Sequence, residues 1–309
     1  MSRDKTILIT GAAGFIASHI VDQFIENNYI VIGVDNLKTG NKKNLNKKLL
    51  FLEIDLNDKN AVKDIFKKFK PSVLIHQASN LVDVELSITN PSLAYQDLLM
   101  TTNLIEEARK NGLQHIIFSS SANVYGNPSS VPIRETARLA PTSPYGLTKL
   151  AIENYLAYFS NRYKIDFTVF RYFNVYGERQ NTLSGAAIPT FIRQMIKNEP
   201  ITINGGKQIR DFVYVKDVAR ANYLAGTKKI TGIYNVGSGK SITINDVVRL
   251  IESLMEKKNK IIYSKQDQSD LQFSQASIAR IKKKLGWTPE VSFAEGLNKT
   301  IAYCITALK

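Results

Sequence analysis

The most constraining feature of this sequence is a regular alternation, through its first part, of strand-length apolar runs with helix-length patterns. Strands are expected at 5–10, 29–35, 49–56, 71–79 and 113–121, and helices at 15–28, 60–69 and 93–112. Successive βαβ units of this kind predict a parallel sheet with helices on both faces, because each crossover helix buries its apolar face against the strands. We therefore expect an α/β protein built on a doubly wound parallel sheet.

The order loosens after about residue 175, where runs such as "ITINGG" and "RDFVYVKDVARANYLA" replace the regular alternation. These runs suggest a smaller C-terminal α/β lobe that binds a substrate. We predict a first domain over 1–174 and a second over 175–309, with some segments of the second crossing back to the first. A chain of 309 residues with 44% hydrophobic content can bury a core of that size.

The basic residues give the chain a formal net charge of +14, but they lie in short scattered clusters such as 42–43, 67–68 and 282–284. A nucleic-acid site is expected to concentrate basic residues in one stripe with interleaved aromatic side chains. Solvated helix faces explain scattered clusters better, so we expect no nucleic-acid partner. The excess positive charge favours an anionic small molecule as the ligand.

Three features favour a cytoplasmic location. The sequence contains no run of about 18 apolar residues, so we expect neither a membrane span nor a membrane partner. The N-terminal "MSRDKTILIT" passes directly into a strand-like run, which leaves no room for a secretory signal. Cys304 is the single cysteine, which excludes an internal disulfide and fits a reducing compartment.

The first strand-to-helix turn carries a phosphate-binding pattern. The stretch "TGAAGFIASH" places Gly11, Gly14 and Ala17 at the three positions where small residues are needed. Gly11 permits a tight turn, Gly14 lets the backbone approach a pyrophosphate, and Ala17 lets the helix pack closely on the strand. The phosphates are then expected at the N-terminus of the helix, where amide groups and the helix dipole favour anions.

An acidic residue follows at the distance that adenosine ribose recognition requires. Asp35 ends the second expected strand, 21 residues after Gly14. A carboxylate there accepts hydrogen bonds from the ribose hydroxyls and repels a 2′-phosphate. The turn and the acid together predict NAD as the cofactor of a Rossmann-type domain, although the nearby Lys38 and Lys42 keep NADP from being excluded.

The stretch "SPYGLTK" places Tyr145 and Lys149 four residues apart at the start of an expected helix. Residues at that spacing share one helix face, and taken alone such a pair is more often a surface contact. Beside a dinucleotide, a lysine ammonium lowers the pKa of a tyrosine from about 10 and so makes it a usable base. Ser121 ends a neighbouring expected strand. We predict that Ser121, Tyr145 and Lys149 converge as the catalytic residues.

At this point the chain resembles the extended short-chain dehydrogenase/reductase superfamily, and within it the nucleotide-sugar epimerases of the UDP-glucose and UDP-N-acetylglucosamine 4-epimerase type. The similarity covers nearly the whole length and rests on a combination of motifs. They are "TGAAGFIAS", "VDNLKTG", "SSSANVYG", "SPYGLTKLAIENY", "RYFNVYGERQ", "RDFVYVKDVA", "YNVGSG" and "KKLGWTP".

The resemblance implies particular site residues and no metal. Cofactor contacts are implied for Gly11, Gly14, Phe15, Ile16, Asp35, Asn36, Asp55, Leu56, Gln77, Ala78, Tyr145 and Lys149. Substrate contacts are implied for Ser121, Asn174, Ile201, Ile203, Arg210, Asp270 and Ser274. Asn174 and Arg210 would hold the diphosphate, which suits the amide and guanidinium donors of these side chains. The alternative for Arg210 is a surface ion pair with Asp211.

The implied activity is NAD-dependent 4-epimerisation of a UDP-sugar through a 4-keto intermediate, in a homodimeric enzyme. Dehydratases and decarboxylases of the superfamily carry acidic residues after the catalytic Ser/Thr, whereas this chain has Ala122 and Asn123, which favours epimerisation. Ser274 stands where plain-hexose epimerases carry a bulky tyrosine. The small side chain predicts turnover of UDP-GlcNAc and UDP-GalNAc beside, or in preference to, UDP-Glc and UDP-Gal.

Three other departures from the family pattern stand near the expected site. Asp97 replaces an asparagine near the cofactor, and Met100 replaces a frequent glycine. The diphosphate-binding arginine is missing from "DQSD" at 267–270, where Lys265 could replace it. His76, by contrast, is expected to be a buried structural residue.

Two alternatives to UDP-sugar epimerisation remain at this stage. The first is another modification of a nucleotide sugar by a related enzyme, such as epimerisation at another carbon, dehydration or reduction. The second is a non-catalytic NAD-binding protein, which would have little reason to combine Ser121, Tyr145 and Lys149.

Overall fold

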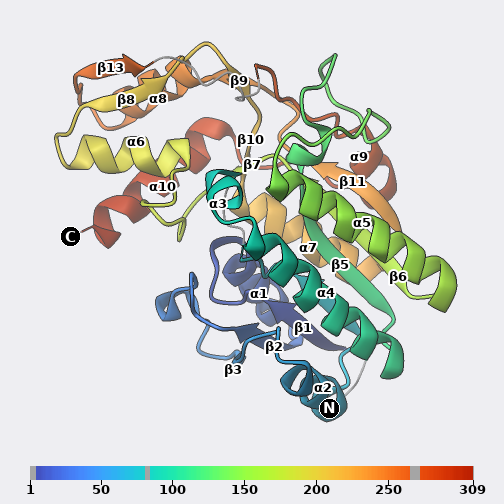
Figure 1. The fold of residues 1–309 in the computed structure, drawn as a ribbon. Helices are drawn as coiled ribbons and strands as arrows, with labels where there is room; N and C mark the ends of the chain where they lie inside the picture. Colours follow the sequence, from blue (N-terminus) through green and yellow to red (C-terminus); the bar gives the residue numbers. More distant parts are fainter. Residues whose placement is uncertain (1–4, 81–83, 265–271, 309) are drawn as a thin grey trace.

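The computed structural model describes residues 5–80, 84–264 and 272–308. Within these residues the largest element is a seven-stranded, all-parallel sheet in the order β11-β6-β5-β4-β1-β2-β3 (Figure 1). Its strands are β1 (Thr6–Thr10), β2 (Ile30–Asp35), β3 (Leu50–Glu53), β4 (Val73–His76), β5 (His115–Ser121), β6 (Asp166–Tyr172) and β11 (Gly232–Val236). The strand order reverses at β1, so the predicted doubly wound sheet is confirmed.

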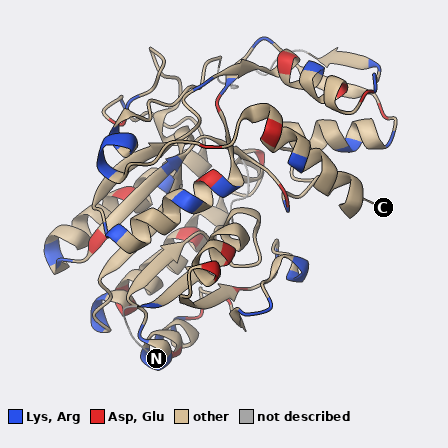
Figure 2. Cartoon of the chain, turned by 180° about the vertical axis from the view of Figure 1, so that it is seen from behind, with Lys and Arg blue, Asp and Glu red and all other residues tan. Residues whose placement is uncertain are grey.

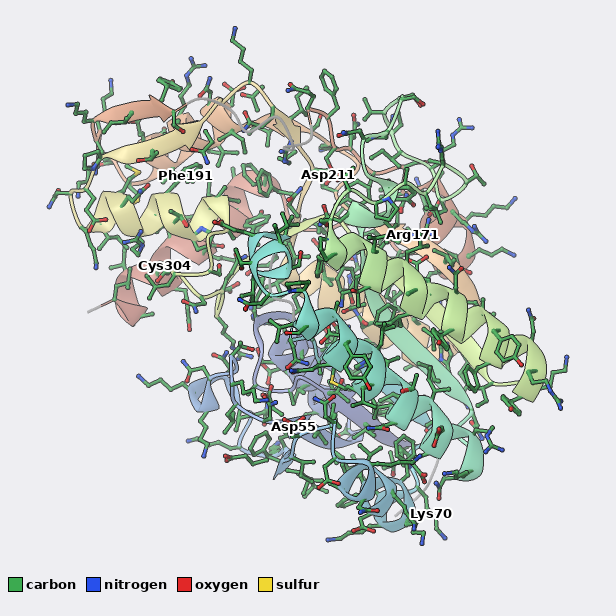
Figure 3. The ribbon with its side chains drawn as sticks, viewed as in Figure 1. Asp55, Lys70, Arg171, Phe191, Asp211 and Cys304 are labelled. Atoms are coloured by element: carbon green, nitrogen blue, oxygen red, sulfur yellow. The ribbon has the colours of Figure 1, made fainter. Side chains whose placement is uncertain are left out.

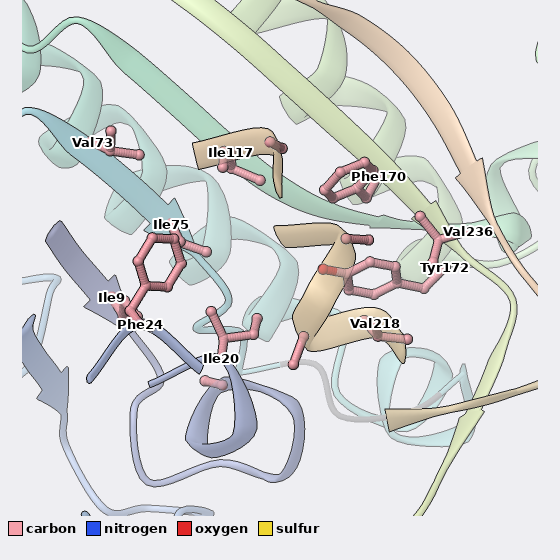
Figure 4. Close-up of a cluster of buried hydrophobic side chains, with 14 of the residues drawn as sticks. Ile9, Ile20, Phe24, Val73, Ile75, Ile117, Phe170, Tyr172, Val218 and Val236 are labelled. Carbon is pink, nitrogen blue, oxygen red and sulfur yellow. The ribbon is translucent and has the colours of Figure 1, made fainter. Parts of the chain in front are cut away.

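Helices cover both faces of this sheet. One face packs against α1 (Phe15–Glu26), α7 (Val215–Lys228) and α9 (Ala279–Leu285), and the other against α2 (Lys59–Phe69), α4 (Ser92–Lys110) and α5 (Pro144–Tyr163). Within β1, Ile7 and Ile9 join the first core and Leu8 joins the second, because successive side chains of a strand point to opposite faces. Figure 4 shows part of the first core, where Ile20 and Phe24 of α1 meet the sheet residues.

Two elements from the second half of the chain return to the main sheet. The run that contains α7 was expected in the smaller lobe, but α7 lies behind the sheet beside α1, with Val218 in the same core as Phe24. A Cβ atom on Gly226 would lie 2.9 Å from the ring of Phe24, so the glycine permits this close packing. Strand β11 then pairs in parallel with β6 at the edge of the sheet.

The smaller lobe is made of short strand pairs and three helices around its own core. The pairs are β7 (Asn174–Tyr176) with β10 (Phe212–Tyr214), β8 (Ile201–Asn204) with β13 (Ile261–Ser264), and β9 (Ile209–Arg210) with β12 (Ile242–Thr243). The helices are α6 (Ala187–Ile196), α8 (Ile244–Leu254) and α10 (Phe293–Ala307). Phe191 and Cys304 lie in this core, and the Cys304 thiol is buried without a disulfide partner (Figure 3).

Three further short helices lie in the described ranges: α3 (Val84–Thr89) and the 3₁₀ turns η2 (Lys42–Asn44) and η3 (Ala122–Tyr125). Lysine and arginine side chains are spread over both lobes and not gathered into one stripe on the face drawn in Figure 2. Among the described helices, none combines the length and apolar character needed to cross a bilayer.

Candidate active site

A cavity of about 1800 Å³ lies where the carboxyl ends of the main-sheet strands face the smaller lobe. Residues that follow β1, β2, β4 and β5 line one side of it, and residues of α6 and β8 line the other. Ligands of doubly wound sheets bind at this edge. Single ligand pockets usually measure roughly 300–1,000 Å³, so this cavity can hold two ligands together.

The glycine turn forms a close-fitting backbone cradle in this cavity. Gly11 has a φ of +70°, and a Cβ atom there would lie 2.9 Å from the backbone nitrogen of Ala78. A Cβ on Gly14 would lie 2.9 Å from the carbonyl oxygen of Gly11. No side chain caps the N-terminus of α1 and no acidic residue stands in its first turn, so the helix end suits a phosphate.

Asp35 lies at the end of β2 on the cavity wall. Its carboxylate accepts hydrogen bonds from the backbone nitrogens of Ala13 (3.0 Å) and Leu37 (2.8 Å). A carboxylate has about four acceptor directions, so two of them remain for a ligand such as a ribose diol. The structure therefore places Asp35 where the sequence predicted a ribose acceptor.

Asp55 also lines the cavity, beyond the end of β3 (Figure 3), and the backbone nitrogen of the preceding Ile54 donates to the Asp35 carbonyl at 3.0 Å. Partial burial acts to raise the pKa of Asp55, but hydrogen bonds from Asn57 and Lys38 lower it to about 2. The Lys38 ammonium is 3.1 Å from the Asp55 carboxylate, and Lys42 is paired with Glu53 at 2.9 Å. Lys38 and Lys42, which left NADP as an alternative cofactor in the sequence analysis, are thus already paired with carboxylates.

All of the residues that the resemblance implied for the cofactor line this cavity. They are Gly11, Gly14, Phe15, Ile16, Asp35, Asn36, Asp55, Leu56, Gln77, Ala78, Tyr145 and Lys149. The cradle, the uncapped helix and the available acceptor of Asp35 fit NAD.

Local signals at the start of α5 position the tyrosine and the lysine. Ser143 is the N-cap, and its hydroxyl accepts a hydrogen bond from the Gly146 nitrogen at 3.2 Å. Pro144 occupies the first helical position, where its missing N–H costs nothing. Tyr145 therefore falls in the first turn and Lys149 one turn later. The Lys149 Nζ lies 5.6 Å from the centre of the Tyr145 ring.

Lys149 is a buried cation held above the end of the main sheet. Burial lowers the pKa of its ammonium, and the charge of Asp97 opposes that shift. Asp97 is itself buried and accepts hydrogen bonds from the Ser79 hydroxyl and the Asn80 nitrogen. The aspartate that replaces the family's asparagine therefore supplies a countercharge to Lys149.

His76 is a structural residue, as predicted. Its Nδ1 lies 2.8 Å from the Thr10 hydroxyl and its Nε2 lies 3.0 Å from the Thr101 hydroxyl. Burial, and then the charge of Lys149, lower the pKa of the imidazole to about 3. A neutral histidine with both ring nitrogens engaged cannot serve as the base.

Tyr172 also lines the cavity and is a competitor for the role of base. Burial raises the pKa of Tyr172 to about 12, and its hydroxyl oxygen accepts hydrogen bonds from Asn222 and Gln77. Tyr145, in contrast to Tyr172, has the Lys149 ammonium one helical turn away. The geometry thus favours Tyr145.

On the substrate side, Arg210 lines both the main cavity and an adjoining pocket of about 230 Å³. Asn174 lines the adjoining pocket and is not among the described residues that line the main cavity. Its Nδ2 donates to the Asp211 carbonyl at 3.2 Å. Asp211 is fully buried and its carboxylate accepts four hydrogen bonds from other segments. The alternative of a surface ion pair between Arg210 and Asp211 is therefore wrong.

Three of the predicted substrate residues line neither the main cavity nor the adjoining pocket. Ile201 and Ile203 point into the core of the smaller lobe, while Thr202 and Asn204 line the cavity, because side chains of β8 alternate between the two faces. Ser274 is buried, with its backbone nitrogen bonded to the Ile209 carbonyl, and is not among the described lining residues.

Asp270, Lys265 and Asp267 lie outside the described residues. Several lining residues were not found from the sequence, among them Ser79, Asn80, Phe173, Phe191, Gln194, Thr202 and Asn204. The alternation within "ITIN" could have identified the last two once either face of that strand was known to be buried.

Comparisons with known proteins agree with this site. The model of the NAD dependent epimerase/dehydratase family matches residues 7–237. A protein of Methanocaldococcus jannaschii, provisionally named a UDP-glucose 4-epimerase, is 41% identical over 300 residues, which cover 96% of this chain and 97% of that protein.

Two solved structures share the fold over nearly their whole length. The UDP-glucose 4-epimerase of Thermotoga maritima with UDP-glucose has 38% identity and a TM-score of 0.94, covering 98% of this chain and 100% of that one. A UDP-N-acetylglucosamine 4-epimerase from Methanobrevibacter ruminantium M1, in complex with UDP-N-acetylmuramic acid, has 34% identity and a TM-score of 0.93, covering 99% of each chain. The chain therefore belongs to the NAD dependent epimerase/dehydratase family.

Proposed function

We propose that the protein interconverts the C4 epimers of a UDP-sugar with NAD as a bound cofactor. The observation that carries the proposal is the joint placement of Ser121, Tyr145 and Lys149 on the wall of one cavity, beside the dinucleotide cradle. The relatives whose names specify UDP-glucose or UDP-N-acetylglucosamine 4-epimerisation support it. A cavity of about 1800 Å³ gives both the dinucleotide and a UDP-sugar room in one site.

Bound NAD supplies a hydride acceptor, and later a hydride donor, at C4 of the sugar. Tyr145 takes the proton of the 4-hydroxyl as the C4 hydride leaves, which converts the alcohol to a ketone. Lys149 favours the phenolate form of Tyr145 by its charge. Tyr145 would return the proton to the same oxygen when the 4-keto sugar, turned over in the cavity, is reduced at the opposite face of C4. Atoms and charges balance over the cycle.

Arg210 is the cation that we assign to the diphosphate of the substrate, since a guanidinium fork matches phosphate oxygens. Thr202 and Asn204, on the exposed face of β8, replace Ile201 and Ile203 as the side chains that meet the nucleotide. We assign the cofactor mainly to the 1–174 domain and the nucleotide sugar mainly to the 175–309 lobe.

Epimerisation is favoured over 4,6-dehydration by the residues that follow Ser121. Ala122 and Asn123 form the start of the η3 turn, and neither can act as an acid. A dehydratase needs an acid that protonates the leaving hydroxyl group. The substrate range that we propose includes UDP-Glc/UDP-Gal and UDP-GlcNAc/UDP-GalNAc.

The decisive experiment incubates the purified protein with each of these four UDP-sugars and separates the products by anion-exchange chromatography. We expect conversion of at least one sugar to its C4 epimer without added NAD. A Tyr145→Phe variant should keep the fold and the bound cofactor but lose about two orders of magnitude of turnover or more, because the general base is gone. A dehydrated 4-keto-6-deoxy product, or near-normal turnover by this variant, would contradict the proposal.

We also propose that the protein is a cytoplasmic homodimer that supplies sugar nucleotides for polysaccharide biosynthesis. The support for a dimer is an apolar face on α4 and α5, where Tyr95, Leu147, Tyr155 and Tyr158 are exposed. These helices lie side by side on one face of the sheet (Figure 1). Light scattering should give twice the chain mass of 34.7 kDa, and a Tyr158→Glu substitution should shift the protein toward the monomer.

A further inference from the structure

The hydroxyl of Ser121 is held from one side by a single residue, Asn123. The Asn123 backbone nitrogen donates to Ser121 Oγ at 3.2 Å, and the Asn123 side-chain Nδ2 donates to the same oxygen at 3.1 Å. Both hydrogen bonds that the described residues make to this oxygen are thus donated to it. A hydroxyl oxygen has two acceptor positions and one hydrogen, so both acceptor positions are filled from one side.

This arrangement decides the direction in which Ser121 can act. With its acceptor positions filled, the hydroxyl can only donate, and its hydrogen points away from Asn123. Ser121 lines the cavity, whereas Asn123 is not among the described lining residues. The oxygen at C4 of the substrate changes between a hydroxyl that loses its proton and a carbonyl that only accepts, and a fixed donor suits both.

Asn123 is also fixed against the helix that carries the catalytic tyrosine. A Cβ atom on Gly146 would lie 2.7 Å from the Asn123 carbonyl oxygen, so the start of α5 packs directly on this residue. The Gly126 nitrogen donates to the same carbonyl at 3.3 Å. The backbone of Asn123 therefore sets the spacing between Ser121 and the neighbouring Tyr145.

We propose that Asn123 is a positioning residue that locks the Ser121 hydroxyl as a hydrogen-bond donor toward the substrate oxygen at C4. The proposal rests on the proposed function, because it assigns Asn123 a role in the same 4-epimerisation. It gives a positive role to a side chain that stands where dehydratases and decarboxylases of the superfamily carry an acid.

The first test compares Asn123→Ala with Asn123→Asp. Alanine keeps the backbone donor but removes the side-chain donor, so kcat should fall about tenfold with KM within about twofold, since a single hydrogen bond is lost outside the cavity. An ionised aspartate cannot donate and instead accepts the Ser121 hydrogen, which turns the hydroxyl away from the substrate. At pH 8 the kcat of Asn123→Asp should therefore fall further than that of Asn123→Ala.

The pH dependence separates this effect from a general loss of structure. The activity of Asn123→Asp divided by that of the wild type should rise as the pH falls from 8 to about 4, because a carboxyl group with an ordinary pKa of about 3.9 becomes protonated near the lower limit and can donate again. The ratio removes the pH effects that both proteins share. A ratio that stays constant over this range would overturn the proposal.

A double-mutant cycle gives the second test. If Asn123 acts through Ser121, then Asn123→Ala should cost nothing further in a Ser121→Ala background. Asn127→Ala, a change at an exposed asparagine four residues further on, is the matched control and should leave kcat unchanged. Independent, additive losses would overturn the positioning role. A wild type that turns over none of the UDP-sugars would instead overturn the proposed function itself, and this role with it.

Discussion

Two buried aspartates, Asp35 and Asp211, organise the two sides of the cavity in different ways. Asp35 accepts two hydrogen bonds from the backbone and keeps the rest of its carboxylate on the cavity wall. Asp211 accepts four hydrogen bonds, from Ser238 (backbone and hydroxyl), Gly239 and Ala276, at 2.6–3.0 Å. The first carboxylate is available to a ligand, whereas the second is fully used by the protein.

The comparison shows how an aspartate that can bind a ligand is distinguished from one that stabilises the fold. Each aspartate stands beside a short apolar strand, and the local sequence does not distinguish them. The number of donors that each carboxylate already holds does distinguish them, because a carboxylate offers about four acceptor directions. Asp211 joins β7, through its backbone carbonyl, to the segment after β11 and to Ala276. It fixes the smaller lobe to the main sheet (Figure 3).

The largest effect is expected from Asp211→Asn. The amide NH₂ group would face N–H donors, so about two buried hydrogen bonds are lost and their donors are left unsatisfied. We expect the free energy of unfolding to fall by about 3 kcal/mol or more, at roughly 1–3 kcal/mol for each buried unsatisfied group. The melting temperature should fall by roughly 5–10 °C.

The matched change, Asp35→Asn, should affect the cofactor and not the fold. We expect the Kd for NAD to rise about tenfold, since a charged hydrogen-bond acceptor of the ribose is weakened. The preference for NAD over NADP should narrow because the repelling charge is removed. Calorimetric titration of NAD and of NADP into the apoprotein measures both Kd values and hence the preference. If Asp35→Asn destabilises the apoprotein as strongly as Asp211→Asn does, the contrast between the two carboxylates is wrong.

The main sheet and the smaller lobe also differ in how much of their structure could be predicted from the sequence. Strands β1 to β5 of the main sheet follow from apolar runs of six to nine residues, and α1, α2 and α4 from helical periods, which local sequence carries directly. Strands β6 and β11 were not predicted. The smaller lobe rests on strand pairs such as β9 with β12, which contain two residues each. Strands that short have no readable period, and their partners are chosen by tertiary packing. The sequence predicted that segments of the second half cross back to the first domain, but it did not identify α7 as one of them, because the packing of α7 against α1 is a tertiary contact.

The candidate site divides in a similar way. Gly11, Asp35, Tyr145 and Lys149 lie next to strand ends or in the first two turns of a helix, where sequence position fixes the direction in which the chain presents them. Ile201 and Ile203 were assigned to the wrong face of β8, because a shift of one residue exchanges the two faces of a strand. The hydrogen bond from Asn123 to Ser121 depends on a side-chain rotamer, which no sequence pattern records.

The smallest effect per residue that we predict is a loss of stability in mild acid, and it should arise in the main-sheet domain. All three histidines of the chain, His19, His76 and His115, lie in that domain. Burial, and then the charge of Lys149, lower the pKa of His76 to about 3, and burial lowers that of His115 to about 4. The unfolded chain takes up these protons near pH 6.5, so between pH 6.5 and about 4 it binds more protons than the folded protein.

Stability must therefore be fully present above pH 6.5 and must fall as the pH drops below that value. At pH 5.5 each of these two histidines should cost about 1 kcal/mol relative to pH 7.5. Urea unfolding at the two pH values measures the difference. In His115→Gln the pH-dependent loss should shrink by about half, because one of the two strongly shifted groups is gone. An unchanged pH dependence in that variant would place the acid sensitivity in other groups. Asp211 is not one of them, because burial raises its pKa, and a carboxyl group with a raised pKa favours the folded state as the pH falls.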